Sequence, residues 1–336
     1  MKFRCAYLCI LIVGLLYISV IGATPARAAN NVLNPFHCDF NKDGKADVLW
    51  YNTANGDMVV WYMNGFSYTS ASVLPTVTDL TWEPAVCGDF LDTGNTDIAW
   101  GQSGTNDVAL WLENGINLTK SCTLTPPSPW KVEGIADMNG KGPLDLLWRN
   151  PNTGQHAIWY LDGCAPVAGE TTYATLSDTN WRVKHTGDFN GDGNADLLWV
   201  ENNTGEVAIW LMNNTAVLGS ATYGPYSGWS VAKVADFNGD GKSDLLWENT
   251  STGQISIWFM NGIAATGYAN FTVPTGWEVV GADDYNGDGH VDILWWNSTS
   301  GAVALWLMNG GSIVSEHTVA TVSSGWYPIA GESKGK

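Results

Sequence analysis

A stretch that opens with aspartate, best exemplified by DFNGDGKSDLLW, recurs six times along this chain at an almost constant spacing. The openings are 50, 48, 51, 48 and 48 residues apart, and they are Asp39, Asp89, Asp137, Asp188, Asp236 and Asp284. A period of this size, carried by strand-forming residues, is typical of a radial array of four-stranded units. The repeat therefore constrains the fold more strongly than any other feature of the sequence.

Tryptophan keeps the same period at three positions of the repeat. The first column is Trp50, Trp100, Trp148, Trp199, Trp247 and Trp295; the second is Trp61, Trp111, Trp159, Trp210, Trp258 and Trp306; the third is Trp82, Trp130, Trp181, Trp229, Trp277 and Trp326. With Trp296 they account for all 19 tryptophans. A tryptophan that recurs at one position of every unit is more often a packing residue than a binding residue, so we expect these columns to pack between units.

Each repeat contains four candidate strands. In the fifth repeat, apolar runs at 244–247 and 255–260 flank a glycine turn, a polar segment follows at 262–274, and a last run starts at Trp277. Two such runs joined by a glycine turn indicate a hairpin. The turn residue is glycine in every repeat except the second, where Asn106 predicts the same positive φ. The sequence thus predicts an all-β chain that forms one six-bladed β-propeller of four-stranded blades.

The ends of the chain provide two candidates for the strand that closes the ring. One is the segment from Asn31 to Phe36, and the other begins at Trp326. We expect the N- and C-terminal strands to close the ring together. Because the C-terminal copy keeps the tryptophan of the third column, we expect it to complete the first blade.

Residues 1–28 have the three regions of a secretory signal peptide. MKFR is basic, an apolar run extends from Cys5 to Ala23, and small residues occupy positions 26 and 28. An uncleaved anchor is the alternative. We expect residues 29–336 to form a single propeller domain, without membrane insertion after cleavage, that is secreted, periplasmic or at the cell surface.

The charge of the expected mature chain opposes binding to nucleic acid. Cleavage removes three of the 15 basic residues and none of the 33 acidic ones, which gives a formal charge of −21. Such a balance disfavours nucleic acid and anionic membranes and favours cations. The aspartates are concentrated in the repeated loops, so we interpret this acidity mainly as local metal chemistry.

Four cysteines remain after the signal peptide, and an even number in an exported chain indicates disulfides. Cys38 and Cys87 each precede the opening aspartate of neighbouring repeats, while Cys122 and Cys164 follow the second tryptophan column. Three pairings are possible. Pairing like with like would link the first three units, and free buried thiols are the alternative.

Four of the six loops carry a complete set of candidate calcium ligands. Oxygen side chains occupy positions one, three, five and nine around a glycine at position six, and the backbone carbonyl of position seven can join them. The ligands are Asp39, Asn41, Asp43, Lys45, Asp47; Asp188, Asn190, Asp192, Asn194, Asp196; Asp236, Asn238, Asp240, Lys242, Asp244; and Asp284, Asn286, Asp288, His290, Asp292, where Lys45, Asn194, Lys242 and His290 contribute the carbonyl. We therefore expect about four Ca²⁺ sites. Hairpin turns rich in Asp and Asn, without metal, are the alternative.

The second and third loops depart from this pattern. Leu91 and Thr93 replace the ligands at positions three and five of the second loop, and Lys141 occupies position five of the third. We expect neither loop to bind calcium well. The ammonium of Lys141 is expected to neutralise the carboxylates of its own loop.

The recurring DxNxDGxxD followed by an apolar strand resembles the FG-GAP or VCBS repeat family over about residues 31–331. That resemblance implies a propeller with calcium in hairpin loops, as in integrin α-chain heads and fungal propeller lectins. Six copies, rather than the seven typical of those relatives, limit any direct transfer of their ligand sites.

We expect a binding or adhesion module without catalytic residues. The five histidines occupy different repeat positions, and none stands in a motif with a Ser or Cys nucleophile. A glycan is the favoured partner because the related propellers bind sugars between blades; a surface protein, in adhesion or envelope assembly, is the alternative, and a hydrolase or lyase is a weaker one. We expect the chain to be a monomer.

The position after the first tryptophan column varies more than its surroundings. Its occupants are Tyr51, Gly101, Arg149, Val200, Glu248 and Trp296. Such variety inside a regular framework predicts a surface edge that determines specificity, and it argues against six identical sugar pockets.

Overall fold

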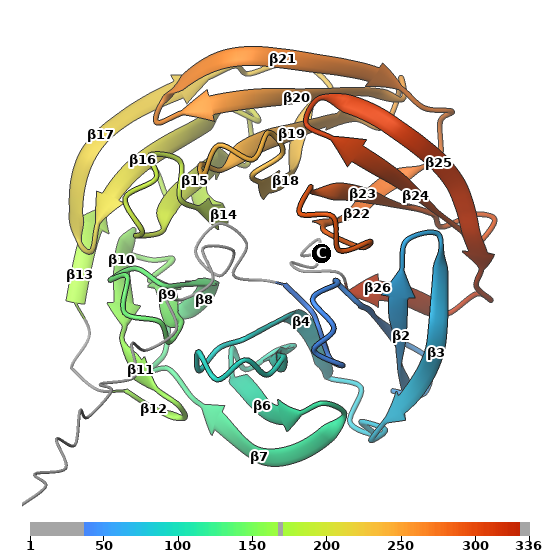
Figure 1. Ribbon diagram of the computed structural model, residues 1–336. Helices are drawn as coiled ribbons and strands as arrows, with labels where there is room; N and C mark the ends of the chain where they lie inside the picture. Colours follow the sequence, from blue (N-terminus) through green and yellow to red (C-terminus); the bar gives the residue numbers. More distant parts are fainter. Residues whose placement is uncertain (1–36, 167–170, 330–336) are drawn as a thin grey trace, which may run out of the picture.

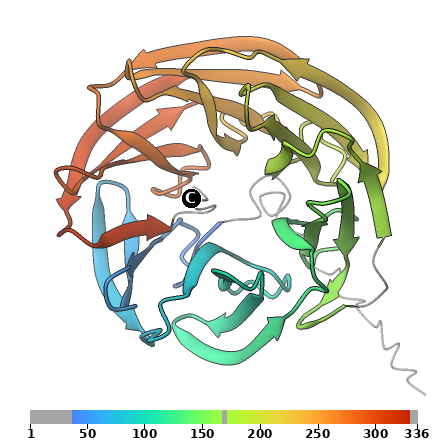
Figure 2. The ribbon, with the colours of Figure 1, turned by 180° about the vertical axis from the view of Figure 1, so that it is seen from behind.

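The structure, a computed structural model, describes residues 37–166 and 171–329. Six four-stranded antiparallel sheets stand side by side in a ring around a central axis (Figures 1 and 2). The described residues contain strands and turns and no helix. The predicted six-bladed β-propeller is therefore confirmed.

The first three blades are formed mainly by the first half of the chain. Blade 1 contains β1 (Val48–Asn52), β2 (Met58–Asn64), β3 (Ser67–Leu74) and β26 (Trp326–Ile329). Blade 2 contains β4 (Trp82–Gly88), β5 (Asp97–Gln102), β6 (Val108–Asn114) and β7 (Asn117–Leu124). Blade 3 contains β8 (Lys131–Ala136), β9 (Asp145–Arg149), β10 (Gln155–Trp159) and β13 (Thr171–Thr175), and a small hairpin of β11 (Leu161–Asp162) and β12 (Ala165–Pro166) is inserted before β13.

The other three blades are more regular. Blade 4 contains β14 (Trp181–Gly187), β15 (Asp196–Glu201), β16 (Val207–Asn213) and β17 (Ala216–Tyr223). Blade 5 contains β18 (Ser230–Ala235), β19 (Asp244–Asn249), β20 (Gln254–Asn261) and β21 (Ala264–Thr272). Blade 6 contains β22 (Glu278–Asp283), β23 (Asp292–Asn297), β24 (Ala302–Asn309) and β25 (Ser312–Thr321).

Strands follow one another from the central axis to the rim in every blade. Because neighbouring strands are antiparallel, the aspartate loop between the first two strands and the turn between the last two lie at the same end of the blade. We call the side of the ring that carries these connections the loop face. All six aspartate loops therefore share one face of the propeller.

The C-terminal strand closes the ring in blade 1. Strand β26 pairs with β1 in the register Leu49↔Ile329 and Asn52↔Trp326. The prediction that the C-terminal copy completes the first blade is confirmed. The competing segment from Asn31 to Phe36 lies outside the described residues, as does the predicted signal peptide at 1–28.

The hydrophobic core lies between blades rather than inside one of them. Phe189 of blade 4, for example, packs in one cluster with Leu245 and Met260 of blade 5. The third strand of each blade, such as β20, buries residues on both of its faces. This burial explains its apolar sequence, since each blade is covered by a neighbour on both sides.

The turn between the second and third strands needs a left-handed backbone conformation. Gly56 has φ 77°, and a Cβ there would lie 1.8 Å from the carbonyl oxygen of Val77. Asn106 has φ 75° at the same position of blade 2. The positive φ predicted for this asparagine is confirmed.

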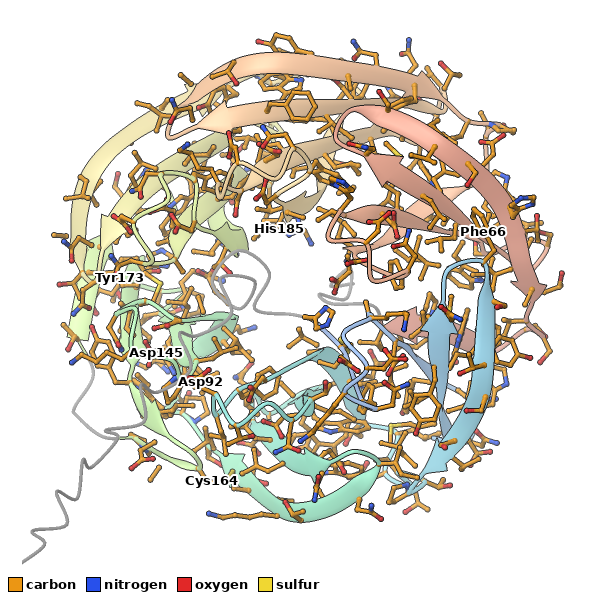
Figure 3. All side chains as sticks on the ribbon, in the orientation of Figure 1. Phe66, Asp92, Asp145, Cys164, Tyr173 and His185 are labelled. Carbon is orange, nitrogen blue, oxygen red and sulfur yellow. A yellow bond between two sulfur atoms is a disulfide. The ribbon has the colours of Figure 1, made fainter. Side chains whose placement is uncertain are left out.

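Two disulfides link the first three blades, and of the three possible pairings the structure has the one that joins like positions. Cys38 is bonded to Cys87 of blade 2, and Cys122 of blade 2 is bonded to Cys164, which lies beside the inserted hairpin at the rim of blade 3 (Figure 3). Cys5 and Cys9 lie outside the described residues. Disulfides of this kind are typical of proteins that fold in an oxidising compartment.

Candidate functional site

The opening aspartate organises each loop by accepting backbone N–H groups. In loop four, Asp188 Oδ1 accepts from Gly191 at 2.7 Å and Asp192 at 3.2 Å, while Oδ2 accepts from Gly193 at 2.8 Å. Asp39 in loop one accepts from the N–H groups of positions five and six in the same way. The first carboxylate is therefore the centre around which the loop turns.

Positions three, five and seven form a chain of short-range hydrogen bonds. Asn190 Oδ1 accepts the N–H of Asp192 at 2.8 Å, and Asp192 Oδ1 accepts the N–H of Asn194 at 2.9 Å. In loop one the position-seven side chain also turns back, since Lys45 Nζ lies 3.3 Å from Asp43 Oδ2. The side chains at positions three and five are partly or fully exposed in the four complete loops.

The aspartate at position nine points into the blade instead. Asp196 Oδ2 accepts the N–H of Phe189 at 2.9 Å, and Oδ1 accepts the N–H of Met212 at 2.6 Å. The same pair of bonds recurs in all six loops, at Asp47, Asp97, Asp145, Asp196, Asp244 and Asp292. This carboxylate therefore ties the loop to the third strand of its own blade. The sequence interpretation treated it only as a ligand.

Burial is the main cause that raises the pKa of every position-nine carboxyl to about 7. The backbone hydrogen bonds oppose this rise, and the other carboxylates of the loop add to it. Burial also raises the pKa of Asp188 and Asp236 at position one. A nearby cation would favour the ionised form of all these groups.

The donor set of the complete loops fits calcium in its chemistry. Each loop offers three carboxylates and an asparagine oxygen, which are hard ligands. Within residues 37–166 and 171–329, however, no three His, Cys, Asp or Glu side chains are arranged around one common metal position. The oxygens are instead directed at backbone amides of the loop, so a cation would have to draw the carboxylates at positions one and five together.

The two loops that lack ligands at positions three and five keep the same frame. Asp89 accepts the N–H groups of Thr93 at 2.9 Å and Gly94 at 2.6 Å, and Asp137 accepts from the corresponding residues of loop three. The Lys141 side chain forms no ion pair within 4.0 Å with any carboxylate in the described part of the chain. It lines a cavity of about 450 Å³ together with Asp145 and Tyr160, so the predicted neutralisation does not take the form of a direct ion pair.

Backbone hydrogen bonds join the loops of neighbouring blades. Ser243 N–H donates to the Asp188 carbonyl at 2.7 Å, and Ala46 N–H donates to the Asp284 carbonyl at 2.8 Å across the closure of the ring. Equivalent bonds join blade 2 to blade 3 and blade 3 to blade 4. Anything that orders one loop therefore also acts on the contact between two blades.

Half of the variable positions after the first tryptophan column are buried. Tyr51, Arg149 and Glu248 are only 1%, 5% and 2% exposed, whereas the other three positions are partly exposed. The Tyr51 hydroxyl donates to the Trp82 carbonyl at 3.1 Å, and Glu248 Oε1 accepts the N–H of Val279 at 3.2 Å. The predicted surface edge is therefore wrong for these three residues, whose side chains make different buried contacts.

A buried charged cluster in blade 3 was not predicted. Glu133 Oε1 lies 2.6 Å from Arg149 Nε, and Glu133 Oε2 lies 3.0 Å from His156 Nδ1, with all three side chains at most 6% exposed. Tyr173 lies beside it, its hydroxyl has no hydrogen-bond partner within the described ranges, and burial raises its pKa. The only sequence signal was charged residues inside strands that are otherwise apolar.

The first and second tryptophan columns pack against each other within each blade. First-column rings are 1–2% exposed, and each lies with its centroid 4.7–5.1 Å from the second-column ring of the same blade. Their indole N–H groups have no hydrogen-bond partner among the described residues. Each first-column indole also faces the preceding blade. We call the space between that indole and the preceding blade a slot, and its contents differ from one blade interface to the next.

Aromatic side chains fill several of these slots. Tyr51 packs against Trp100, His156 against Trp199, and Tyr226 against Trp247, at centroid distances of 6.1, 4.7 and 5.5 Å. These contacts lie at the interfaces of blades 1 and 2, 3 and 4, and 4 and 5.

The slot between blades 5 and 6 contains a cavity of about 350 Å³. Trp277, Trp295 and Trp306 line it, so all three columns meet there. Glu316 and Thr318 of β25 lie directly opposite Trp306 and Ala304 of β24. Cross-strand partners share a face of the sheet. The cavity therefore combines aromatic walls with a carboxylate and a hydroxyl at its rim.

Residues 188–247 match the FG-GAP-like repeat. This stretch is an FG-GAP-like repeat. It includes loops four and five and all of blade 4 beyond its first strand, so the resemblance seen in the aspartate pattern is confirmed there. No curated protein sequence matches the chain.

Solved structures with a similar fold are β-propellers of low sequence identity. The structure of a nidogen/laminin complex is 11% identical at a TM-score of 0.51, covering 80% of this chain and 92% of that one. A protein of unknown function from Bacteroides caccae is 13% identical at a TM-score of 0.51, covering 84% and 98%. Identities this low show the shared propeller fold alone. The described residues contain no helix long and apolar enough to cross a membrane.

Proposed function

We propose that this protein is an exported, calcium-stabilised, non-catalytic propeller that binds a carbohydrate. Four loops with a hard-oxygen donor set support the calcium assignment, and two disulfides support export. The FG-GAP-like repeat and the propeller fold support a binding module. The expected active form is the monomer.

The cavity between blades 5 and 6 is the observation on which the choice of a carbohydrate ligand rests. Trp295 and Trp306 are 1% and 8% exposed, so the half-buried Trp277 offers the accessible apolar face to a sugar ring. Glu316 and Thr318 offer a hydrogen-bond acceptor and a hydroxyl to the OH groups of that ring. A cavity of about 350 Å³ lies within the size range of small-molecule sites. Because Tyr51, His156 and Tyr226 fill three of the other slots, and the three tryptophan columns meet in this one, binding is expected here.

The contacts of the histidines support a role without catalysis. His37 is hydrogen-bonded to Asp283 at 2.9 Å, and His156 contacts Glu133. His317 is among the residues that line the cavity between blades 5 and 6, and its ring packs against Phe66 of blade 1. A general base for hydrolysis would be placed beside a nucleophile or a water, and no Ser or Cys side chain lines this cavity among the described residues.

The first experiment is a glycan array probed with the calcium-loaded protein, followed by calorimetry on the sugars that bind. Trp277→Ala is expected to weaken binding at least about tenfold, because it removes one aromatic wall of the slot. The matched control is Trp229→Ala, the same column in blade 5, where Tyr226 packs in the slot. That variant is expected to keep the wild-type affinity.

Two results would contradict the proposal in different ways. Equal affinity of Trp277→Ala and the wild type would place the sugar elsewhere on the molecule. An array without any bound glycan would exclude carbohydrate and favour a protein partner, to be sought by pull-down from a surface extract. Turnover of a bound sugar would overturn the non-catalytic assignment.

A further inference from the structure

Blade 2 has a carboxylate where every other blade has an apolar side chain. The residue two positions after the second-column tryptophan is Met63, Leu161, Met212, Met260 or Met308 in the other five blades, and Glu113 in blade 2. Glu113 lies on β6 and is 3% exposed. A charge has therefore replaced a core residue without being moved to the surface.

The surroundings of this position lie between two blades. Met260 packs in one cluster with Phe189 of the preceding blade, and Met308 packs in one with Phe237. By the same register, Glu113 is on the side of β6 that faces blade 1. The carboxylate is thus placed in the interface of blades 1 and 2, beside the loop that lacks the ordinary ligands.

Among residues 37–166 and 171–329, no partner of Glu113 compensates its charge. Neither Oε1 nor Oε2 accepts a hydrogen bond, and the carboxylate forms no ion pair within the described residues. Its own N–H donates to Asp97 Oδ1 at 2.9 Å, so a second buried carboxylate lies next to it. Burial, and then Asp97, raises the pKa of Glu113 to about 7. Two buried carboxylates without a counter-charge are strongly disfavoured.

A third buried oxygen without a donor belongs to the same loop. Asn95 Oδ1 accepts no hydrogen bond, although the Asn95 amide nitrogen donates to Thr93. Loop two lacks ligands at positions three and five, where Leu91 and Thr93 stand. Blade 2 therefore lacks the exposed loop oxygens at positions three and five and has instead a buried carboxylate, Glu113, on β6.

We propose that blade 2 holds a divalent cation between Glu113 of β6 and Asp97 of its loop, at a site built differently from the other loops. Two carboxylates balance a divalent charge, and hard oxygen ligands select Ca²⁺ or Mg²⁺ over softer metals. The Asn95 amide oxygen, two residues before Asp97, is the additional ligand we assign because it has no donor among the described residues. This site would bind the loop to the third strand in an interface that the Cys38–Cys87 disulfide also crosses.

The test replaces Glu113 with the residue that the other blades use. Wild-type protein and Glu113→Met are dialysed against Ca²⁺, and in a second series against Mg²⁺, and bound metal per chain is counted by mass spectrometry. Glu113→Met is expected to bind one ion fewer than the wild type. Combined with Asp240→Ala, which removes a ligand from loop five, it is expected to bind two fewer.

A proton shared by the two carboxylates is the competing occupant. In that case Glu113→Met would keep the wild-type metal count in both series and melt at a higher temperature in chelator, which overturns the proposal. Glu113→Gln keeps the shape of the side chain if the methionine variant does not fold. It is expected to lose the same single ion, and an unchanged count would overturn the proposal equally.

Discussion

Loop two, residues 89–97, and loop four, residues 188–196, have nearly the same hydrogen bonds and different chemistry. In both, the first aspartate accepts the N–H groups of positions five and six, and the last accepts two buried N–H groups. Only loop four has oxygen ligands at positions three and five. Positions one and nine therefore build the fold, whereas positions three and five add the capacity for a cation.

The largest expected effect falls on position nine and is the same in both loops. Asp97→Ala and Asp196→Ala each leave two buried N–H groups without an acceptor, which costs about 3 kcal/mol of unfolding free energy. The measurement is urea denaturation in chelator. The exposed Thr93→Ala is the control, with a change below about 0.5 kcal/mol. A small effect of Asp97→Ala beside a large one of Asp196→Ala would refute a shared structural role.

Calcium should add stability through the complete loops and not through positions three and five of loop two. At free calcium 100 times the dissociation constant, one occupied site adds about 2.7 kcal/mol to stability. Asp240→Ala removes a central carboxylate and should lose that increment together with one bound ion. Thr93→Ala, the same position in loop two, should lose neither. Melting curves and metal counts with and without chelator measure both, and an unchanged wild-type midpoint would exclude calcium.

Restoring the ligand at position five should allow loop three to bind calcium. Lys141→Asp gives loop three aspartates at positions one, five and nine and asparagine at position three. We expect one additional bound ion and, for a site at ten times its dissociation constant, about 1.4 kcal/mol of added stability. Calorimetric titration against the wild type provides the count. No gain would show that the backbone of loop three, and not its side chains, prevents binding.

The smallest effect concerns position four. Lys42 has φ 62°, while loops three to six have glycine there. Lys42→Gly removes the strain of a left-handed lysine but adds freedom to the unfolded chain, so we expect a net gain of about 0.5 kcal/mol. Denaturation in chelator measures it. A loss of stability would mean that the Lys42 side chain makes a favourable contact that outweighs the strain.

Most of the fold could be predicted because the same sequence pattern occurs six times, once in each blade. The spacing of the aspartates, the glycine turn and the tryptophan columns gave the number of blades, the strands and the strand that closes the ring. Equivalent positions in adjacent repeats suggested pairing Cys38 with Cys87 and Cys122 with Cys164, but only the structure chose this pairing among three. Periodicity succeeds here because each unit repeats the same local contacts.

The site was predicted less completely because variety at one position of the repeat has two possible physical causes. The position can form an exposed specificity edge, or it can make different buried contacts in different blades. Tyr51, Arg149 and Glu248 vary because each makes a different contact with its surroundings, and they are buried. Asp196 was expected to be a ligand, and it is also the acceptor that holds β16 to the loop. A pattern of residue types could not distinguish these roles, since both need a carboxylate at the same place.

The sequence by itself determined the architecture: six units of one period, each able to bury its strands only against a neighbour, close into a propeller. Only the tertiary structure decided which slots between blades are filled by side chains and which contain a cavity, and which carboxylates are buried. Those outcomes depend on side chains from two adjacent blades, such as Tyr226 against Trp247 or Glu113 beside Asp97. Packing between blades is a property of pairs of repeats, and the pattern within one repeat does not contain it.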